Sequence, residues 1–215
     1  MATTAKTTEH TINLRRHWTV DDYHKMIEVG ILDEQDKVEL IGGMVVEMSA
    51  KGRRHNRTIV ALVDAFSAVL PCGEALLAPQ NSFLLSDDTE PEPDVSVIRG
   101  PLERYDHRPT TAADVLLLVE VADSSLRFDR NVKLPRYARA GVPEVWIADL
   151  TGEGGVERYT EPAAEGAYGS VARFDRGQEV VSVVLAGVSM SVDQLLGQMT
   201  GADGADAVRD AQEGD

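Results

Sequence analysis

The stretch that decides the fold is "DVLLLVEVADSSLRFDRNVKLPRYARAGVPEVWIADL", Asp114 to Leu150. It opens with a nearly continuous apolar run, which is typical of a strand buried on both faces of a sheet. A helical segment then ends at Gly141, and a second apolar strand runs through "VWIADL". Strand, helix and strand at this spacing predict a crossover between parallel strands, and therefore a mixed α/β sheet.

Glu120 is the anomaly of this stretch, because it is an acid inside the apolar run. A carboxylate left unpaired in such a strand costs on the order of several kcal/mol. Glu120 therefore needs a cation, a hydrogen-bonding partner or a strand end near solvent.

A second group of acids lies upstream in "SDDTEPEPDVSVIRG", residues 86–100. The two prolines favour extended conformations and residues 95–98 alternate like a strand, so Asp94 lies where a loop becomes a strand. Two interpretations follow from the residues alone: a solvated acidic loop, or a cation site that a second carboxylate completes. The four acids that precede Asp94 are expected at the surface: Asp87, Asp88, Glu90 and Glu92.

The rest of the chain gives weaker signals of helix and strand. We expect helices over 20–29, 55–70 and 191–199, a hairpin around Gly42 and Gly43, and extended segments over 75–85, 94–98, 155–160, 167–174 and 179–185. The division into domains is expected to be a flexible leader over 1–17, a single domain over 18–199 and a disordered acidic tail over 200–215.

Composition limits the class of protein. The chain has 215 residues, of which 43% are hydrophobic and 27% charged, and no apolar run approaches the roughly 20 residues of a membrane span. We expect no membrane partner. A single cysteine, Cys72, fits a reducing compartment, so a cytoplasmic location is expected. The formal charge of -15 argues against nonspecific adhesion to nucleic acid, although basic residues cluster locally over 51–57 and 127–139.

The motif "EPDVSVI" followed by "LLLVEVADSSLRFDRNVKLPRYARAGVPEVWIADL" resembles the Uma family of putative bacterial restriction endonucleases, a branch of the PD-(D/E)xK nuclease superfamily. "WTVDDYHKMIE", "VELIGGMVVEMS" and the helix at His55 match the family in the same order, so the resemblance spans about residues 18–150. It implies a restriction-endonuclease-like α/β fold, in which helices flank a mixed central β-sheet, with an additional β-rich C-terminal part. It also implies a metal-dependent endonuclease that hydrolyses phosphodiester bonds of DNA.

The resemblance assigns the metal to two carboxylates. Asp94 and Glu120 would hold Mg²⁺ or Mn²⁺ against the scissile phosphodiester, and the carbonyl of Val121 would complete the set. Hard cations of this kind favour carboxylate oxygens and retain waters, one of which can become the nucleophile.

The catalytic lysine is displaced in this chain. Two residues after Glu120 the superfamily has a lysine, whereas this chain has Ala122. The resemblance moves the role to Lys133, which would orient the attacking water and stabilise the charge that develops at phosphorus. Spacing alone gives another interpretation, an ion pair between Lys133 and Asp129 within one helix. Pro135 interrupts that helix and leaves the direction of Lys133 open.

Further candidates come from the same resemblance. Glu39 would be a third ligand or a proton acceptor, and His55 would contact phosphate beside Arg53, Arg54 and Arg57. A lone acid in a hairpin is more often a solvated residue, and an isolated histidine more often has no chemistry.

Two other functions stay open at this point. The replaced lysine allows a catalytically inactive nucleic-acid-binding or interaction module with a nuclease-like fold. The acidic charge allows a small metal-binding protein that acts on something other than nucleic acid. Whether two copies pair as a homodimer to cut both strands is also open.

Overall fold

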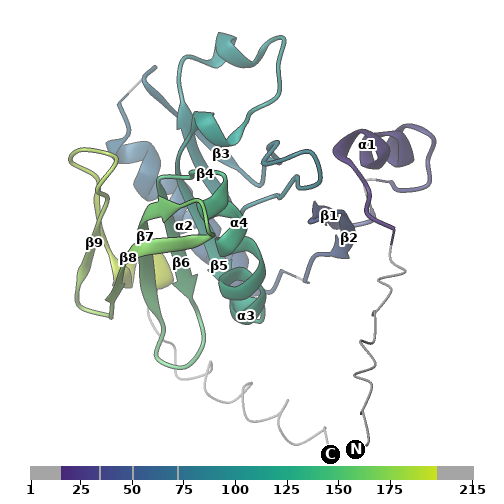
Figure 1. The fold of residues 1–215 in the computed structure, drawn as a ribbon. Helices are drawn as coiled ribbons and strands as arrows, with labels where there is room; N and C mark the ends of the chain where they lie inside the picture. The colour runs from purple at the N-terminus through teal and green to yellow at the C-terminus, as the bar shows by residue number, and fades with distance from the viewer. Residues whose placement is uncertain (1–15, 34, 50, 72, 198–215) are drawn as a thin grey trace, which may run out of the picture.

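The computed structural model describes residues 16–33, 35–49, 51–71 and 73–197 (Figure 1). Its centre is a six-stranded sheet in the order β3-β4-β5-β6-β7-β8. Only β5 and β6 run parallel, and every other neighbouring pair in this sheet is antiparallel, so the mixed α/β sheet is confirmed. The strands are β3 (Ala75–Pro79), β4 (Val95–Arg99), β5 (Val115–Ala122), β6 (Glu144–Asp149), β7 (Gly155–Ala163) and β8 (Ala167–Phe174).

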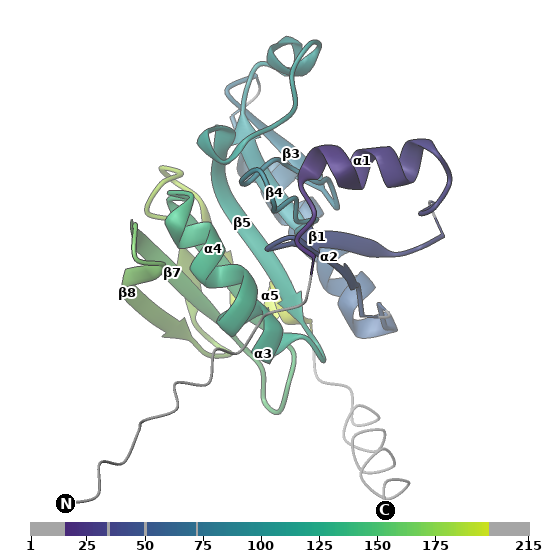
Figure 2. The same ribbon diagram turned by 45° about the vertical axis from the view of Figure 1, so that its right-hand side comes forward.

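Helices cover both faces of the sheet (Figures 1 and 2). On one face α2 (Arg53–Val69) and the short α5 (Val192–Leu196) pack in one core cluster with the odd-numbered residues 117, 119 and 121 of β5. On the other face α4 (Leu134–Arg139) packs with Leu118 and Ala122. Because both faces of β5 are buried, its sequence shows no alternation.

The crossover from β5 to β6 consists of three short helical pieces. They are α3 (Leu126–Phe128), a π-helical turn η3 (Asp129–Lys133) and α4. Pro135 has no N–H to donate, and just before it the backbone widens so that the N–H of Leu134 bonds to the carbonyl of Asp129. The expected helix is therefore segmented, and the widened turn sets the direction of Lys133.

The N-terminal part forms a separate layer beside β4 and β5 (Figure 2). The helix α1 (Val20–Glu28) begins at a capping box made by Thr19 and Asp22. The hairpin of β1 (Val38–Ile41) and β2 (Met44–Glu47) turns at two glycines of positive φ, as expected. The N–H of Glu90 donates to the carbonyl of Leu40 at 2.8 Å, which joins the hairpin to the segment before β4.

The C-terminal strands are mostly a continuation of the central sheet, because β7 and β8 belong to it. Only β9 (Glu179–Val181) and β10 (Ser189–Ser191) form a separate two-stranded sheet. The expected strand over 179–185 was too long, since the carboxylate of Glu144 accepts the N–H groups of Val183 and Val184 and bends the chain there. The expected strand over 75–85 was also too long: β3 ends at Pro79, and Gln80 has a φ of 52°.

Between β4 and β5 the chain makes two short 3-10 turns, η1 (Leu102–Tyr105) and η2 (Ala112–Asp114). Most of the expected leader, all of the expected tail and residues 198–199 of the expected last helix lie outside the described residues. In the described ranges, no helix is both long enough and apolar enough to cross a membrane.

Candidate active site

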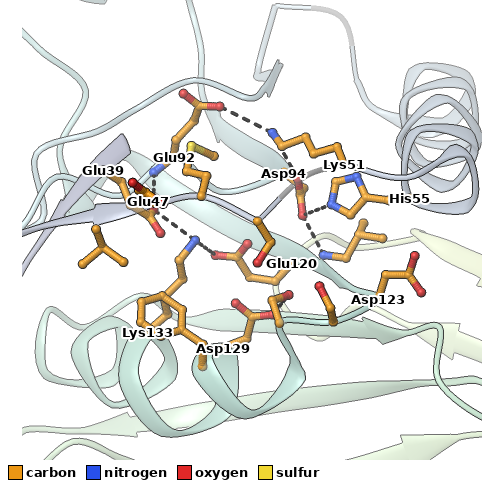
Figure 3. Close-up of a pocket in the computed structure, with 17 residues that line it drawn as sticks. Glu39, Glu47, Lys51, His55, Glu92, Asp94, Glu120, Asp123, Asp129 and Lys133 are labelled. Atoms are coloured by element: carbon orange, nitrogen blue, oxygen red, sulfur yellow. Dashed lines mark hydrogen bonds and ion pairs between the residues drawn. The ribbon is translucent and has the colours of Figure 1, made fainter. Parts of the chain in front are cut away.

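Asp94 and Glu120 lie at one end of the pairing between β4 and β5. Val95 is opposite Val119 in this antiparallel pair, so the next positions bring Asp94 beside Glu120. Both are buried, with 6% and 3% of their surface exposed, and both line a cavity of about 240 Å³ (Figure 3). We call this cavity the carboxylate pocket. Glu39, His55, Val121 and Lys133 also line it, so the structure brings these sequence candidates together.

Asp94 is held by groups from two neighbouring elements. Its Oδ2 accepts the backbone N–H of Val121 at 2.9 Å and lies 3.1 Å from Nε2 of His55 on α2. Its Oδ1 lies 3.7 Å from the ammonium of Lys51. One carboxylate oxygen is therefore fixed by two donors, whereas the other faces only a more distant cation.

Lys133 joins two carboxylates that are remote in sequence. Its ammonium lies 3.1 Å from Oε2 of Glu39 on β1 and 3.4 Å from Oε1 of Glu120 on β5 (Figure 3). Asp129 instead accepts a hydrogen bond of 2.6 Å from the hydroxyl of Ser125. The side chain of Lys133 thus reaches back to the strand end, as the family resemblance implied.

Glu120 has a second fixed contact on the covered face of the sheet. The hydroxyl of Tyr137 on α4 donates to Oε1 of Glu120 at 2.6 Å. Within the part of the chain that the structure describes, Oε2 of Glu120 accepts no hydrogen bond. The carboxylate is therefore held through one oxygen and offers the other to the pocket.

The pocket holds more negative than positive charge, and the pKa values reflect this excess. Burial raises the pKa of Glu120 to about 8; Lys133 opposes this, while Asp129 and Asp94 add to it. Burial also raises the pKa of Asp129. For Lys133 burial acts in the opposite direction, but the surrounding carboxylates outweigh it and raise the pKa of its ammonium. Lys133 is therefore a permanent cation.

The basic candidates of α2 occupy different positions. Arg53 is exposed at the start of the helix, but none of Arg53, Arg54 and Arg57 lines the carboxylate pocket. Arg54 donates to the carbonyl of Leu150 at 2.7 Å, which ties it to the end of β6. Arg57 packs against Gly197, where an added Cβ would lie 1.5 Å from its guanidinium.

The structure adds pocket residues that the sequence reasoning did not select. Glu92 was expected at the surface, but it lines the pocket and pairs with Lys51 at 3.6 Å, while its N–H donates to Glu39. The signal was present, because residues 92 and 94 are two apart in an extended segment and so point to the same side. Lys51, one of the basic residues clustered over 51–57, lines the pocket as well.

The donor set fits a divalent cation of the hard class. Asp94 Oδ1 and Glu120 Oε2 are carboxylate oxygens free of backbone donors, and Val121 lies beside them. Among the described residues, no group of three or more His, Cys, Asp or Glu side chains is placed so that it could hold a metal ion. A cation here would have to take its remaining ligands from water or backbone oxygen, which is the arrangement Mg²⁺ favours.

Comparisons with known proteins identify the fold and the family of the chain. A solved structure, described as that of a putative nuclease belonging to DUF820 from Anabaena variabilis, matches with a TM-score of 0.63 and 17% identity over 83% of this chain and 97% of that chain. At this identity the likeness shows the fold. No curated protein matches the chain. The model of the Uma2 family, described as putative restriction endonuclease, matches residues 20–193, and the chain therefore belongs to that family.

Proposed function

We propose that the protein is a metal-dependent endonuclease that hydrolyses phosphodiester bonds of DNA. One observation carries the proposal: Asp94 and Glu120 converge in one pocket, with the ammonium of Lys133 within 3.4 Å of Glu120. Membership of a nuclease family supports the reaction class. The metal, the DNA substrate and a cytoplasmic location belong to the proposal.

The residues of the carboxylate pocket have different roles in the proposed reaction. A divalent cation held by Asp94 and Glu120 would polarise the scissile phosphate and lower the pKa of the attacking water. Lys133 presents a permanent positive charge beside Glu120, where it stabilises the charge that develops at phosphorus. His55 and the N–H of Val121 fix the Asp94 carboxylate.

Phosphate binding needs cations at the mouth of the pocket. Lys51 has 17% of its side chain exposed and lies between Glu92 and Asp94. Arg53 is exposed two residues further on, at the start of α2. We assign these two side chains as contacts to the phosphates of the substrate strand. Their positive charge offsets locally the net charge of -15.

Incubation of supercoiled plasmid and single-stranded circles with Mg²⁺ or Mn²⁺ tests the proposal. We expect wild-type protein to cleave, and Asp94→Asn, Glu120→Gln and Lys133→Met each to lose about 10²–10³-fold in rate, the loss typical of one electrostatic group at a reacting centre. Asp64→Asn, an exposed change on α2, is the matched control for handling and purity.

Equal cleavage by wild type and the three pocket variants would identify a contaminating nuclease and remove the catalytic assignment. Binding of DNA without cleavage would instead favour an inactive nucleic-acid-binding module. That second function is favoured by Ala122, which is fully buried where the superfamily has its lysine. Whether two copies pair stays a prediction, which sedimentation with and without DNA would measure.

A further inference from the structure

A second depression adjoins the carboxylate pocket. It has a volume of about 440 Å³ and lies between α1, β1 and the residue that follows β3. Met48, Lys51 and Glu92 line both cavities, and the ion pair of Lys51 with Glu92 marks their boundary. We call it the side pocket. Through these shared residues the side pocket adjoins the place where Asp94 and Glu120 would hold the scissile phosphate.

The inner wall of the side pocket is apolar. Tyr23, Ile27, Leu32 and Met48 contribute to it. The hydroxyl of Tyr23 donates to the carbonyl of Val38 at 3.1 Å, which fixes this side chain between α1 and β1. Ile27 has 45% of its surface exposed although it is apolar, so α1 presents uncovered apolar surface to the cavity. Planar bases stack on aromatic side chains without regard to sequence, and Tyr23 supplies one to this wall.

The rim of the side pocket carries charges of both signs and offers acceptors to the edge of a base. Asp33, Asp36 and Glu92 supply carboxylates there, while Lys37 and Lys51 supply ammonium groups. The carboxylate oxygens accept hydrogen bonds from the N–H groups of a base. The volume lies within the range of about 300–1,000 Å³ that small-molecule sites occupy. The apolar wall therefore suits the base of a nucleotide, and Lys51 at the boundary suits the phosphate beside it.

Gln80 connects the two cavities through the backbone. Its N–H donates to the carbonyl of Asp94 at 3.1 Å, and its side chain is exposed on the wall of the side pocket. Its φ of 52° lies in the left-handed region, which few residues other than glycine adopt. Conformations of this kind concentrate at functional sites. A side-chain amide offers both a donor and an acceptor to a base edge.

We propose that the side pocket binds the unstacked base of the nucleotide next to the scissile phosphate, and that Gln80 hydrogen-bonds to its edge. This inference rests on the proposed function, because it assigns the path of the substrate strand past the carboxylate pocket. A base can enter the pocket only when it is unpaired. The protein therefore prefers single-stranded or locally opened DNA to a closed duplex.

Abasic scanning of a single-stranded oligonucleotide cleaved at one mapped bond tests the inference. One nucleotide at a time loses its base, and kcat/KM is measured for wild type, Ile27→Trp, Gln80→Ala and the control Glu28→Trp. Ile27→Trp fills the side pocket, whereas Glu28 is exposed on the same helix and does not line it.

We expect the abasic change at one position flanking the cleaved bond to lower wild-type kcat/KM by about 10-fold or more, the size of one lost stacking contact. Ile27→Trp and Gln80→Ala should cut the intact oligonucleotide more slowly and lose this positional sensitivity. Glu28→Trp should behave as wild type. Uniform wild-type rates on all abasic oligonucleotides, or identical behaviour of Ile27→Trp and Glu28→Trp, would overturn the side-pocket assignment and leave the nuclease assignment intact.

A wild-type protein that cleaves no DNA would count against the proposed function alone. The side pocket is then tested by binding. In that case 2-aminopurine replaces each base in turn, and its fluorescence reports unstacking on binding. A rise confined to one position, lost in Ile27→Trp and kept in Glu28→Trp, supports the side pocket. No rise at any position overturns it.

Discussion

Two buried glutamates on the same sheet show what distinguishes the carboxylate pocket from the rest of the molecule. Glu120 on β5 and Glu157 on β7 lie on either side of β6, and both receive a cation from the turn η3. The ammonium of Lys133 pairs with Glu120, and Glu39 shares the same ammonium. Two guanidinium nitrogens of Arg130 donate hydrogen bonds to the carboxylate of Glu157.

The surroundings of Glu157 are balanced in charge. Besides Arg130, its carboxylate contacts Arg173 at 3.2 Å and accepts a hydrogen bond of 2.6 Å from the hydroxyl of Tyr159. Burial works against ionisation, but the bonds from Arg130 and Tyr159 outweigh it, so the pKa of Glu157 is lowered. The pKa of Glu120 is raised to about 8, because burial and neighbouring acids outweigh one lysine. Glu157 is thus ionised and paired within the protein, whereas Glu120 ionises at neutral pH only if a further cation is supplied.

The two cations of η3 offer the largest test of this contrast. Lys133→Met leaves Glu39 and Glu120 buried without their ammonium, which should cost about 3–5 kcal/mol of unfolding free energy in metal-free buffer at pH 9. Arg130→Met should cost less, about 1–3 kcal/mol, because Arg173 and Tyr159 remain at Glu157. Urea unfolding followed by circular dichroism measures both. Equal losses of unfolding free energy would show that Glu120 depends on its cation no more than Glu157 does.

Removal of each glutamate charge should separate activity from stability. Glu120→Gln should lower cleavage by about 10²–10³-fold while the metal-free unfolding free energy stays the same or rises. Glu157→Gln should do the reverse, with a loss of about 1–3 kcal/mol in stability and cleavage at 25 °C within about 2-fold of wild type. Cleavage assays and urea titrations on the same preparations provide both numbers. A stability loss in Glu120→Gln as large as that in Glu157→Gln would contradict the contrast.

The pH dependence of stability gives the smallest effect and has opposite signs for the two residues. Folded protein keeps a proton on Glu120 up to about pH 8, whereas the unfolded chain releases it near pH 4.3, so stability in EDTA should fall as pH rises between about 5 and 8. The Glu157 contribution is complete above pH 4.3 and is lost as pH falls through its lowered pKa. Urea midpoints across this range should show the first slope in wild type and not in Glu120→Gln. A slope unchanged by that substitution would place its origin elsewhere.

Much of the central fold was predictable from local pattern. The apolar run of β5, the crossover and the strand β6 were expected from residues 114–150, and a double-glycine turn gave the β1–β2 hairpin. These features depend on hydrophobic periodicity and backbone conformation, which a single sequence expresses directly. Strand ends were less predictable, because a distant carboxylate at Glu144 ends the extended segment after Val181.

The buried acids mark where prediction from pattern stops. Glu120 and Glu144 both lie in apolar strands, and each is a buried carboxylate in the structure. Glu144 accepts hydrogen bonds from Trp146, Ser182 and the N–H groups of the bend that follows β9, so its needs are met within the fold. The apolar run marked Glu120 as an anomaly, but only the resemblance to a family assigned it to a metal site, since no local pattern separates a satisfied acid from an unsatisfied one.

By itself the sequence determined the central strands and the crossover, and through its resemblance to a family it gave the candidates Asp94, Glu120, Lys133 and Glu39. The tertiary structure decided that Glu92 and Lys51 join them, that Lys133 faces Glu120 while Arg130 faces Glu157, and that the side pocket adjoins the carboxylate pocket. The physical reason is that charge balance depends on distance in space. Residues remote along the chain set it, and no stretch of sequence contains all of them.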